Sequence, residues 1–194
     1  MPLKTKENIS LIGAGLSGPV MATYLSSLGF STDIYESRSD MRTNSTPAGR
    51  SINLALSARG IKALKDIGVY EKIRSTLIPM SGRMIHDENG NVQFQPYGQK
   101  KNEVIYSVPR SNLNKTLMDY AESTNNVNFN FDHELQDIDL KRLKLRFQDR
   151  NIPFSRILGS DGASSKVREF ISKNSDASFL KKPLGHAYKE LTIP

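Results

Sequence analysis

The sequence contains no cysteine. This absence excludes a disulfide framework, a thiolate metal site and a cysteine nucleophile, and it is typical of a protein in the reducing cytoplasm. Long apolar runs are also absent, since no stretch approaches the roughly 18 residues of a membrane-spanning helix. The beginning of the chain lacks the apolar core and the cleavage site of a signal peptide. We therefore expect a cytoplasmic protein with no membrane segment in this stretch.

Histidine is scarce. The chain has 3 histidines, His86, His133 and His186, which lie far apart in the sequence. They are not accompanied by cysteines or carboxylates at the spacing of metal ligands. We therefore predict no metal site, and we expect these histidines to have surface or capping roles.

The charge is basic but dispersed. Lysine and arginine number 27 against 20 acidic residues, which gives a formal net charge of +7. The short basic clusters lack the interleaved aromatic residues of an RNA-binding sheet, so we expect no nucleic-acid partner. Most of these charges are predicted to be solvated, with a few retained for an anionic cofactor.

A strand-turn-helix-strand unit opens the chain. Residues 8–12 form a short β-branched apolar run that ends at a glycine, and residues 20–28 carry apolar side chains at helical spacing. Residues 31–36 read as a second strand. Because crossover connections of this kind are right-handed and join neighbouring strands, we expect the two strands to be parallel neighbours.

The turn between the first strand and the helix has the pattern G-x-G-x-x-G, from Gly13 through Gly15 to Gly18. The first glycine permits the tight turn, the second allows a pyrophosphate to approach the backbone, and the third allows close packing of helix and strand. Glu36 ends the second strand, where a carboxylate can accept hydrogen bonds from an adenosine ribose. This arrangement predicts a dinucleotide site, and it serves NAD and FAD alike. The alternative is a glycine turn with a purely structural role.

The rest of the chain alternates between strands and helices. The polar stretch 38–50 reads as a long surface loop, and Ser57 is expected to cap a helix that ends at Gly68. Asn89-Gly90 predicts a hairpin within residues 84–97. Further expected elements are a strand at 104–108, a helix from Ser111, a strand at 127–131, several strands within 135–158 and a short helix capped by Ser164 or Ser165.

Two features help to choose between NAD and FAD as the cofactor. Asp161-Gly162 follows an apolar strand, and Arg110 lies at the start of a helix. Together with the long loop after Glu36, they resemble the flavoprotein aromatic hydroxylases, whose second fingerprint is an Asp-Gly turn of this kind. Ser164 and Lys166 depart from the residues usual in that family but leave the turn intact.

Three longer strings narrow the resemblance. Residues 49–57 (GRSINLALS), 78–86 (IPMSGRMIH) and 190–194 (ELTIP) are similar to the kynurenine 3-monooxygenase family. The resemblance implies FAD as cofactor, NADPH as co-substrate, and hydroxylation of L-kynurenine with O2 to 3-hydroxykynurenine. In such enzymes the flavin carries the chemistry while the protein binds and orients, so no catalytic side chain and no metal ligand are implied.

The resemblance also assigns residues to the site. Those implied to contact FAD are Gly13, Ala14, Gly15, Leu16, Gly18, Glu36, Ser37, Arg38, Ala55, Arg110, Leu135 and Asp161. Arg83 is implied to pair with the carboxylate of kynurenine, and Tyr97 to hydrogen-bond to it. These residue types suit the roles, because a guanidinium binds a carboxylate with two prongs and a phenol adds a directional donor.

The expected fold class is α/β, a Rossmann-like FAD-binding domain with the beginning of an antiparallel substrate domain. We expect residues 1–75 to form the FAD-binding βαβ unit and a following helix, 76–105 a hairpin insertion near the substrate, 106–170 the remainder of the FAD-binding domain, and 171–194 the start of the substrate sheet. The family's chains continue beyond this stretch, so residues 1–194 alone are expected to be inactive.

Two other functions remain open at this point. One is a flavin hydroxylase of another aromatic acid, which would keep the glycine loop without needing Arg83 and Tyr97 as a pair. The other is a dinucleotide-binding module without catalytic activity.

Overall fold

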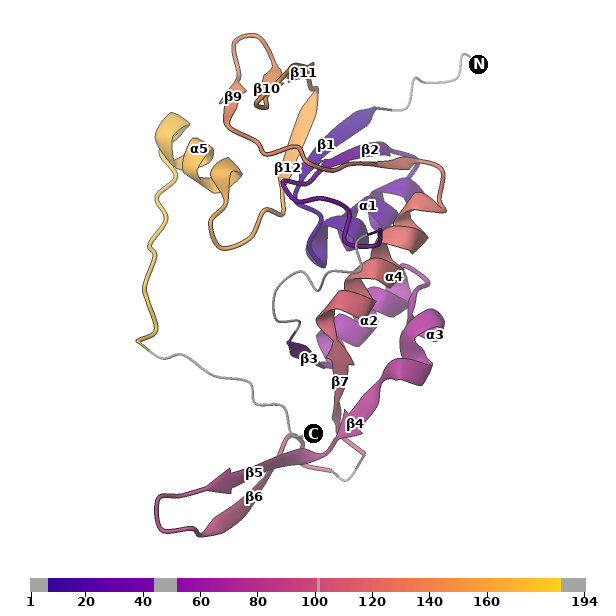
Figure 1. Cartoon of the computed structure of the whole chain (residues 1–194), viewed down its shortest axis with the longest axis vertical. Coiled ribbons are helices and arrows are strands. Elements are labelled where there is room, and N and C mark those ends of the chain that lie inside the picture. Colours follow the sequence, from indigo (N-terminus) through magenta and orange to yellow (C-terminus); the bar gives the residue numbers. More distant parts are fainter. Residues whose placement is uncertain (1–6, 44–51, 101, 186–194) are drawn as a thin grey trace.

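A computed structural model describes residues 7–43, 52–100 and 102–185 (Figure 1). Its centre is a four-stranded parallel sheet in the order β12-β1-β2-β8. The strands are β1 (Asn8–Ile12), β2 (Ser31–Tyr35), β8 (Val127–Asn130) and β12 (Arg156–Gly159). The predicted parallel pairing of the first two strands is confirmed, and β12 flanks β1 on its other side.

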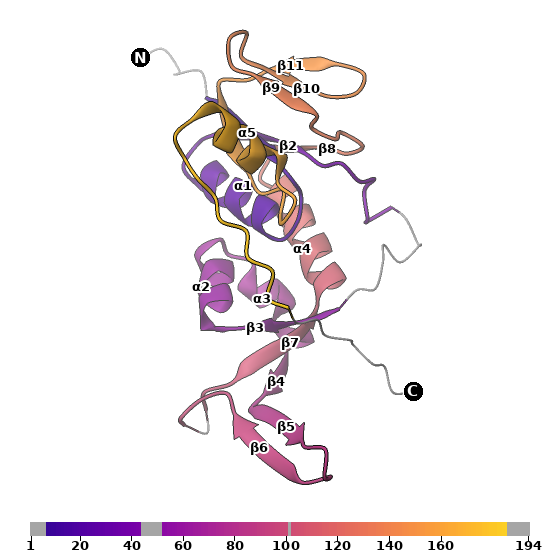
Figure 2. The same cartoon turned by 90° about the vertical axis from the view of Figure 1, so that its left-hand side faces the viewer.

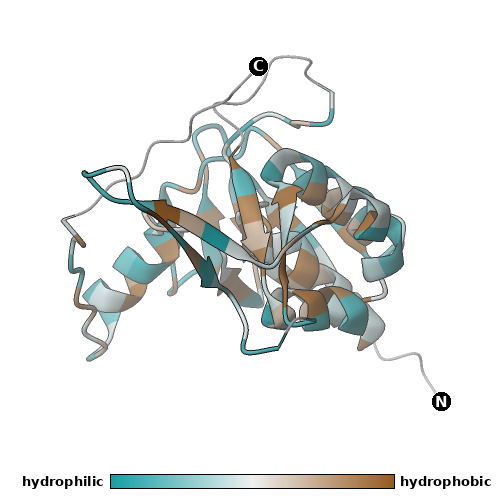
Figure 3. Ribbon diagram, turned by 90° about the horizontal axis from the view of Figure 1, so that it is seen from below, coloured by the Kyte–Doolittle hydropathy of each residue, from teal (hydrophilic) through white to brown (hydrophobic). Residues whose placement is uncertain are grey.

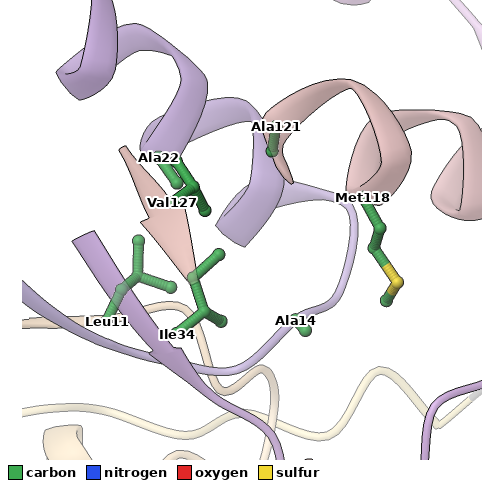
Figure 4. Packing of buried hydrophobic residues seen from close by; sticks show 7 residues of the cluster. All are labelled: Leu11, Ala14, Ala22, Ile34, Met118, Ala121 and Val127. Carbon is green, nitrogen blue, oxygen red and sulfur yellow. The ribbon is translucent and has the colours of Figure 1, made fainter. Parts of the chain in front are cut away.

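Two helices cover one face of this sheet, α1 (Ser17–Ser27) and α4 (Arg110–Glu122). Between them and the strands lies an apolar cluster of Leu11, Ala14, Ala22, Ile34, Met118, Ala121 and Val127 (Figure 4). Small residues at Ala22 and Ala121 allow the helices to approach closely. Full burial of a side chain such as Leu11 or Ile34 stabilises the fold by roughly 1.5–3 kcal/mol.

The opposite face is covered by a small antiparallel sheet and a helix. The strands are β9 (Asp137–Asp139), β10 (Lys144–Arg146) and β11 (Asn151–Pro153), and the helix is α5 (Lys166–Asn174). A second cluster joins these elements to β1 and β2, formed by Ile12, Tyr35, Leu135, Ile138, Leu145, Phe147 and Val167. The parallel sheet is thus enclosed on both faces, as parallel sheets generally are.

A third group of elements lies at the far end of α4 (Figures 1 and 2). An antiparallel sheet in the order β3-β7-β4 is formed by β3 (Asn53–Leu56), β7 (Ile105–Pro109) and β4 (Ile78–Met80). It packs with α2 (Ala58–Asp66), α3 (Tyr70–Ile73) and the 3-10 turn η1 (Arg74–Thr76) around the buried residues Leu64, Ile67, Val69, Ile73, Val108, Leu113 and Leu117.

Beyond this group the hairpin of β5 (Gly82–His86) and β6 (Val92–Pro96) extends away from the rest of the fold (Figure 2). Its turn is closed by Asp87, whose carboxylate accepts the amides of Asn89 and Asn91. The predicted Asn-Gly hairpin is therefore confirmed. In Figure 3 apolar colouring concentrates on the central strands and the inner helix faces, whereas the outer turns are hydrophilic.

Several expectations need correction. β3, β4, α3 and η1 were not predicted, and the helix expected from the apolar pattern at residues 20–28 begins at Ser17, with Pro19 in its first turn. Ser57 precedes α2, but its side chain makes no capping hydrogen bond. The strings at 49–51 and 190–194, the second half of the loop at 38–50, and His186 lie outside the described residues. Among the helices of the described ranges, none has the length and apolar character needed to span a bilayer.

Candidate functional site

A cavity of about 580 Å³ opens where β1, β2 and β12 end. Ligand sites of open parallel sheets lie at this carboxyl edge, and the volume is within the usual range for a cofactor pocket. The lining residues come from the glycine loop, the end of β2, the start of α4, the segment after β8 and the turn after β12. They are Ile12, Gly13, Gly15, Leu16, Ser17, Tyr35, Glu36, Ser37, Arg38, Arg110, His133, Glu134, Leu135, Ser160, Asp161, Gly162, Ser164 and Lys166.

The three glycines of the loop have different surroundings. Gly13 has φ +99°, and a Cβ there would lie 2.7 Å from the carbonyl oxygen of Ser160. A Cβ at Gly18 would overlap the carbonyl oxygen of Gly13. At Gly15 a Cβ would meet nothing within 4 Å. Gly13 and Gly18 are therefore required by the protein's own packing, whereas Gly15 leaves space on the cavity side of the loop.

Glu36 is held at the base of the cavity with only 5% of its surface exposed. Its Oε2 accepts the amide of Ala14 at 2.8 Å, and its Oε1 accepts the amide and Nε of Arg38 at 3.0 and 2.7 Å. Burial alone would raise the pKa of Glu36, but these hydrogen bonds together hold the pKa below its ordinary value. Since Oε2 accepts only this one described hydrogen bond, the ionised carboxylate retains capacity for a ligand hydroxyl.

Aromatic rings form the wall next to Glu36. The Tyr35 ring lies 5.0 Å from that of Phe147 and 6.0 Å from that of His133, and His133 meets Phe147 edge-on at 5.3 Å. The His133 amide donates to the Glu36 carbonyl at 2.8 Å, which ties this wall to the end of β2. Burial, followed by the charge of Asp33, raises the pKa of Tyr35 to about 12, so its phenol stays neutral.

The turn after β12 lies against the glycine loop. The Ser160 hydroxyl donates to the carbonyl oxygens of Ile12 and Gly13 at 3.0 and 2.8 Å. Asp161 accepts the Ser165 hydroxyl at 2.6 Å and the amide of Lys166 at 2.7 Å, at the start of α5. The Ser165 hydroxyl in turn accepts the amide of Arg168, so the predicted cap by Ser165 is confirmed.

The arrangement is suited to an anion. The first-turn amides of α1 have no carbonyl partner within the helix, and the positive end of the helix dipole points the same way. Arg110 lies on the cavity wall, and within the described residues its guanidinium has no acidic partner. The open space at Gly15 suits a pyrophosphate, and Oε2 of Glu36 can accept a hydroxyl of a ribose. The residues present therefore fit a dinucleotide such as FAD.

The structure brings together most of the residues predicted to contact the cofactor. Those that line the cavity are Gly13, Gly15, Leu16, Glu36, Ser37, Arg38, Arg110, Leu135 and Asp161. Ala14 and Gly18 lie behind the loop, where they contribute packing and an amide for Glu36. Ala55 is on β3 and does not line the cavity.

Sequence reasoning missed some lining residues. His133 was expected to have a surface or capping role, yet it lines the cavity and packs against Tyr35. No motif marks it, because its position follows from the pairing of β8 with β2. The small polar Ser160 was also overlooked, although its place directly before the Asp-Gly turn was a usable signal.

Arg83 lies on β5 and Tyr97 directly follows β6, and neither residue lines the cavity. Arg83 pairs with Gln95 across the hairpin, and the Tyr97 amide extends the ladder by donating to the Ser81 carbonyl at 2.9 Å. Because side chains alternate along each strand, Arg83 and Tyr97 fall on the same face as diagonal neighbours. Both side chains are exposed, and the Arg83 Nε donates to Gln95 at 2.8 Å.

The fold and the cavity define a class of protein. Comparison with known families identifies this class. Residues 6–178 match the family described as the FAD binding domain, and the chain belongs to that family.

The similar curated proteins are kynurenine 3-monooxygenases. The enzyme of Legionella pneumophila is 39% identical over 192 residues, which cover 96% of this chain and 43% of the relative. That of Anopheles gambiae is 40% identical over 193 residues, covering 96% of this chain and 40% of the relative. This chain therefore spans less than half of the length of these relatives.

Solved structures share the fold. The tetrameric form of 2-methyl-3-hydroxypyridine-5-carboxylic acid oxygenase has a TM-score of 0.69 at 20% identity, over 87% of this chain and 43% of that one. The p-nitrophenol 4-monooxygenase of Pseudomonas putida has a TM-score of 0.68 at 18% identity, over 87% and 44%. The predicted fold class is thereby confirmed: a Rossmann-like FAD-binding domain accompanied by antiparallel sheets.

Proposed function

We propose that this chain forms the FAD-binding part of an aromatic monooxygenase that hydroxylates L-kynurenine to 3-hydroxykynurenine with NADPH and O2. The single observation that carries the cofactor assignment is the cavity in which Gly15 leaves open space beside a buried, ionised Glu36. When bound, the flavin supplies the redox chemistry of oxygen activation. The similarity to kynurenine 3-monooxygenases over nearly the whole chain supports the substrate.

The residues of the cavity act as binders. Gly15 and the start of α1 would receive the pyrophosphate, Glu36 the adenosine ribose, and Arg110 would add a positive charge on the same wall. Ser37, Arg38, Leu135 and Asp161 would enclose the cofactor and exclude water. Asp161 does so while capping α5, so it orients the turn as well as lining the cavity.

The β5–β6 hairpin is the proposed substrate-facing element. Arg83 and Tyr97 on one face would bind the carboxylate of kynurenine, the guanidinium by two hydrogen bonds and the phenol by a third. The division into residues 1–75, 76–105, 106–170 and 171–194 stays a functional proposal, although its boundaries fall within η1, β7 and α5.

The cofactor assignment is tested by titrating the 194-residue chain with FAD. Purified protein is expected to be yellow or to become so, with the visible absorption bands of flavin and a saturable change in flavin fluorescence. NAD should not compete. A chain that binds NAD and ignores FAD would overturn the assignment and leave a plain dinucleotide-binding module.

The substrate assignment needs the remaining part of an enzyme. Substituting this chain for the matching segment of the Legionella pneumophila relative is expected to give a hybrid that converts kynurenine. In this hybrid, Arg83→Lys should raise the KM for kynurenine about tenfold, because lysine keeps the positive charge but cannot form the two parallel hydrogen bonds of a guanidinium. Arg74→Lys, an exposed arginine outside the hairpin, is the matched control. Equal KM values for both variants would remove Arg83 from the substrate site, and preference for another aromatic acid would identify a sister hydroxylase.

Residues 1–194 alone are expected to give no 3-hydroxykynurenine when supplied with FAD, NADPH, O2 and kynurenine. The reason is that Arg83 and Tyr97 are exposed on a two-stranded hairpin, whereas flavin hydroxylation needs a site from which water is excluded. Product at a rate within tenfold of the hybrid, measured by chromatography, would contradict this expectation.

A further inference from the structure

Arg42 is the most heavily paired side chain near the cavity, although it does not line it. Its guanidinium forms a fork with Asp40, with contacts of 2.8–3.0 Å, and reaches α4 through Asp119 at 3.0 Å and Glu122 at 2.7 Å. Its side chain is 17% exposed. The pKa of Arg42 is raised, first by the hydrogen bond to Asp40, so the side chain carries its charge at every working pH.

The same guanidinium also contacts aromatic rings. It lies 5.5 Å from the centre of the Phe129 ring, on β8, and 5.6 Å from that of Phe131, just after this strand. These two rings stack on each other with centroids 5.6 Å apart. A cation held over aromatic rings is attracted by their electron-rich faces. Arg42 therefore joins three separate parts of the chain: the loop after β2, the helix α4 and the end of β8.

Two of the three parts that Arg42 joins continue into the cavity. The loop after β2 contains Glu36, Ser37 and Arg38, and the segment after β8 leads to His133, Glu134 and Leu135. The two are bonded to each other, because the Arg38 carbonyl accepts the amide of Asp132 at 3.2 Å.

A second connection runs from the same loop to the glycine loop. Met41, next to Arg42, accepts a hydrogen bond at its sulfur from the Asn114 side chain at 3.4 Å. Asn114 also donates to the carbonyl oxygen of Ala14 at 3.1 Å. A loop of this length that carries ligand contacts needs such anchors, because unanchored loops lie at the low-stability end of a fold.

We propose that Arg42 is a positioning residue for the adenosine half of the cofactor: by clamping the loop 37–43 to α4 and β8, it holds Glu36 and Arg38 in the geometry that binds FAD. This inference rests on the proposed cofactor. Arg42 acts through these residues and makes no contact with the ligand itself.

The test compares Arg42→Ala with Arg150→Ala in the 194-residue chain. Arg150 is a matched control, since its ion pair with the neighbouring Asp149 lies in a turn outside the cavity lining. Amide hydrogen exchange is measured first, without cofactor, by NMR. The amides of Ala14 and Arg38, which both donate to Glu36, are expected to exchange about tenfold faster in Arg42→Ala. The amide of Ser160, which donates to Ile12, should not change.

FAD affinity is measured next. Arg42→Ala should raise the Kd about tenfold in the wild-type background and have no further effect in a Glu36→Gln background, because residues that act through one another are not additive. Equal acceleration of all three amides, or additive effects on Kd, would reduce Arg42 to a general stabilising residue and overturn the proposal.

A milder variant covers the case in which Arg42→Ala does not fold. Asp119→Asn with Glu122→Gln leaves Arg42 in place and removes only its exposed partners on α4. This variant is expected to show the same selective acceleration at Arg38, and unchanged exchange there would contradict the clamp. If the wild-type chain does not bind FAD, the proposed function fails, whereas the exchange measurements still decide the role of Arg42.

Discussion

Gly18 packs directly on Gly13, so that a Cβ added to Gly18 would overlap the carbonyl oxygen of Gly13. The intervening Gly15 has no atom within 4 Å of the place where its Cβ would lie. Gly13 and Gly18 therefore serve the packing of the fold, whereas we propose that Gly15 serves the ligand, and substitutions can separate these two roles.

Gly15→Ala should leave the melting temperature nearly unchanged and weaken FAD binding more than tenfold, because a methyl group would occupy the path of the pyrophosphate. Gly18→Ala should destabilise the protein by roughly 1–3 kcal/mol through overpacking. Thermal unfolding and FAD titration of both variants provide the measurement. Wild-type affinity in Gly15→Ala would show that the loop does not approach a cofactor.

Glu36→Gln should raise the Kd for FAD by about tenfold to a hundredfold, since hydrogen bonds to a charged group contribute roughly 1.5–3 kcal/mol. Glu71→Gln, at an exposed side chain of α3, is the control and should bind normally. An equal Kd for the two variants would show that the ribose does not bind at Glu36.

The same residue predicts a response to acid. The pKa of Glu36 is held below its ordinary 4.5, so its contribution to stability is present above that value and is lost as the pH falls through the folded-state pKa. The wild type should therefore lose stability on acidification below about pH 5 more steeply than Glu36→Gln. Urea unfolding at a series of pH values measures this difference, and parallel curves would contradict it.

Tyr35 predicts a response to alkali. Burial raises its pKa from 10.0 to about 12, so the neutral phenol stabilises the fold fully below pH 10 and this contribution is lost as the pH rises to 12. The loss corresponds to about 2–3 kcal/mol. Tyr35→Phe should lack this part of the alkaline destabilisation, whereas Tyr24→Phe, on the exposed face of α1, should keep it. Identical alkaline slopes for Tyr35→Phe and the wild type would show that the phenol titrates normally.

Two serines directly precede helices, but only one of them caps its helix. Ser165 accepts the amide of Arg168, whereas the Ser57 side chain makes no capping bond. Ser165→Ala should cost about 1 kcal/mol, and it should lower the melting temperature by about 2–4 °C. Ser57→Ala should have a smaller effect. Differential scanning calorimetry of both variants is the measurement, and equal shifts would contradict the assignment of the caps.

The parts of the fold that could be predicted from the sequence are those determined by residues close together in the chain. The first βαβ unit was recognisable because the strand, the glycine turn and the helix follow each other within a short stretch, and the hairpin because Asn89-Gly90 lies between strand-like segments. β3 and β4 were missed, since each is only 3 or 4 residues long and becomes a strand only by pairing with β7. Periodicity cannot reveal strands of this length.

The residues of the site also fall into those that the sequence could predict and those that it could not. Glu36 and the glycines were predictable, because their roles follow from a motif with fixed spacing. His133 enters the cavity only through the pairing of β8 with β2, which a single sequence does not display. Ser160 could have been found from its place directly before the Asp-Gly turn. Ala55 was assigned by resemblance alone, and the structure places it on β3 outside the cavity.

The hydrogen bonds from Ser160 to Ile12 and Gly13 have a consequence for biosynthesis. They join the end of β1 to the turn after β12, the last strand of this sheet among the described residues, across 148 and 147 positions of sequence. A ribosome must therefore release the chain up to Ser160 before the glycine loop acquires this neighbour, and long-range contacts of this kind form slowly. During that interval the nascent chain holds an unpaired β1 edge, so a chaperone that shields strand edges would raise the yield of folded protein.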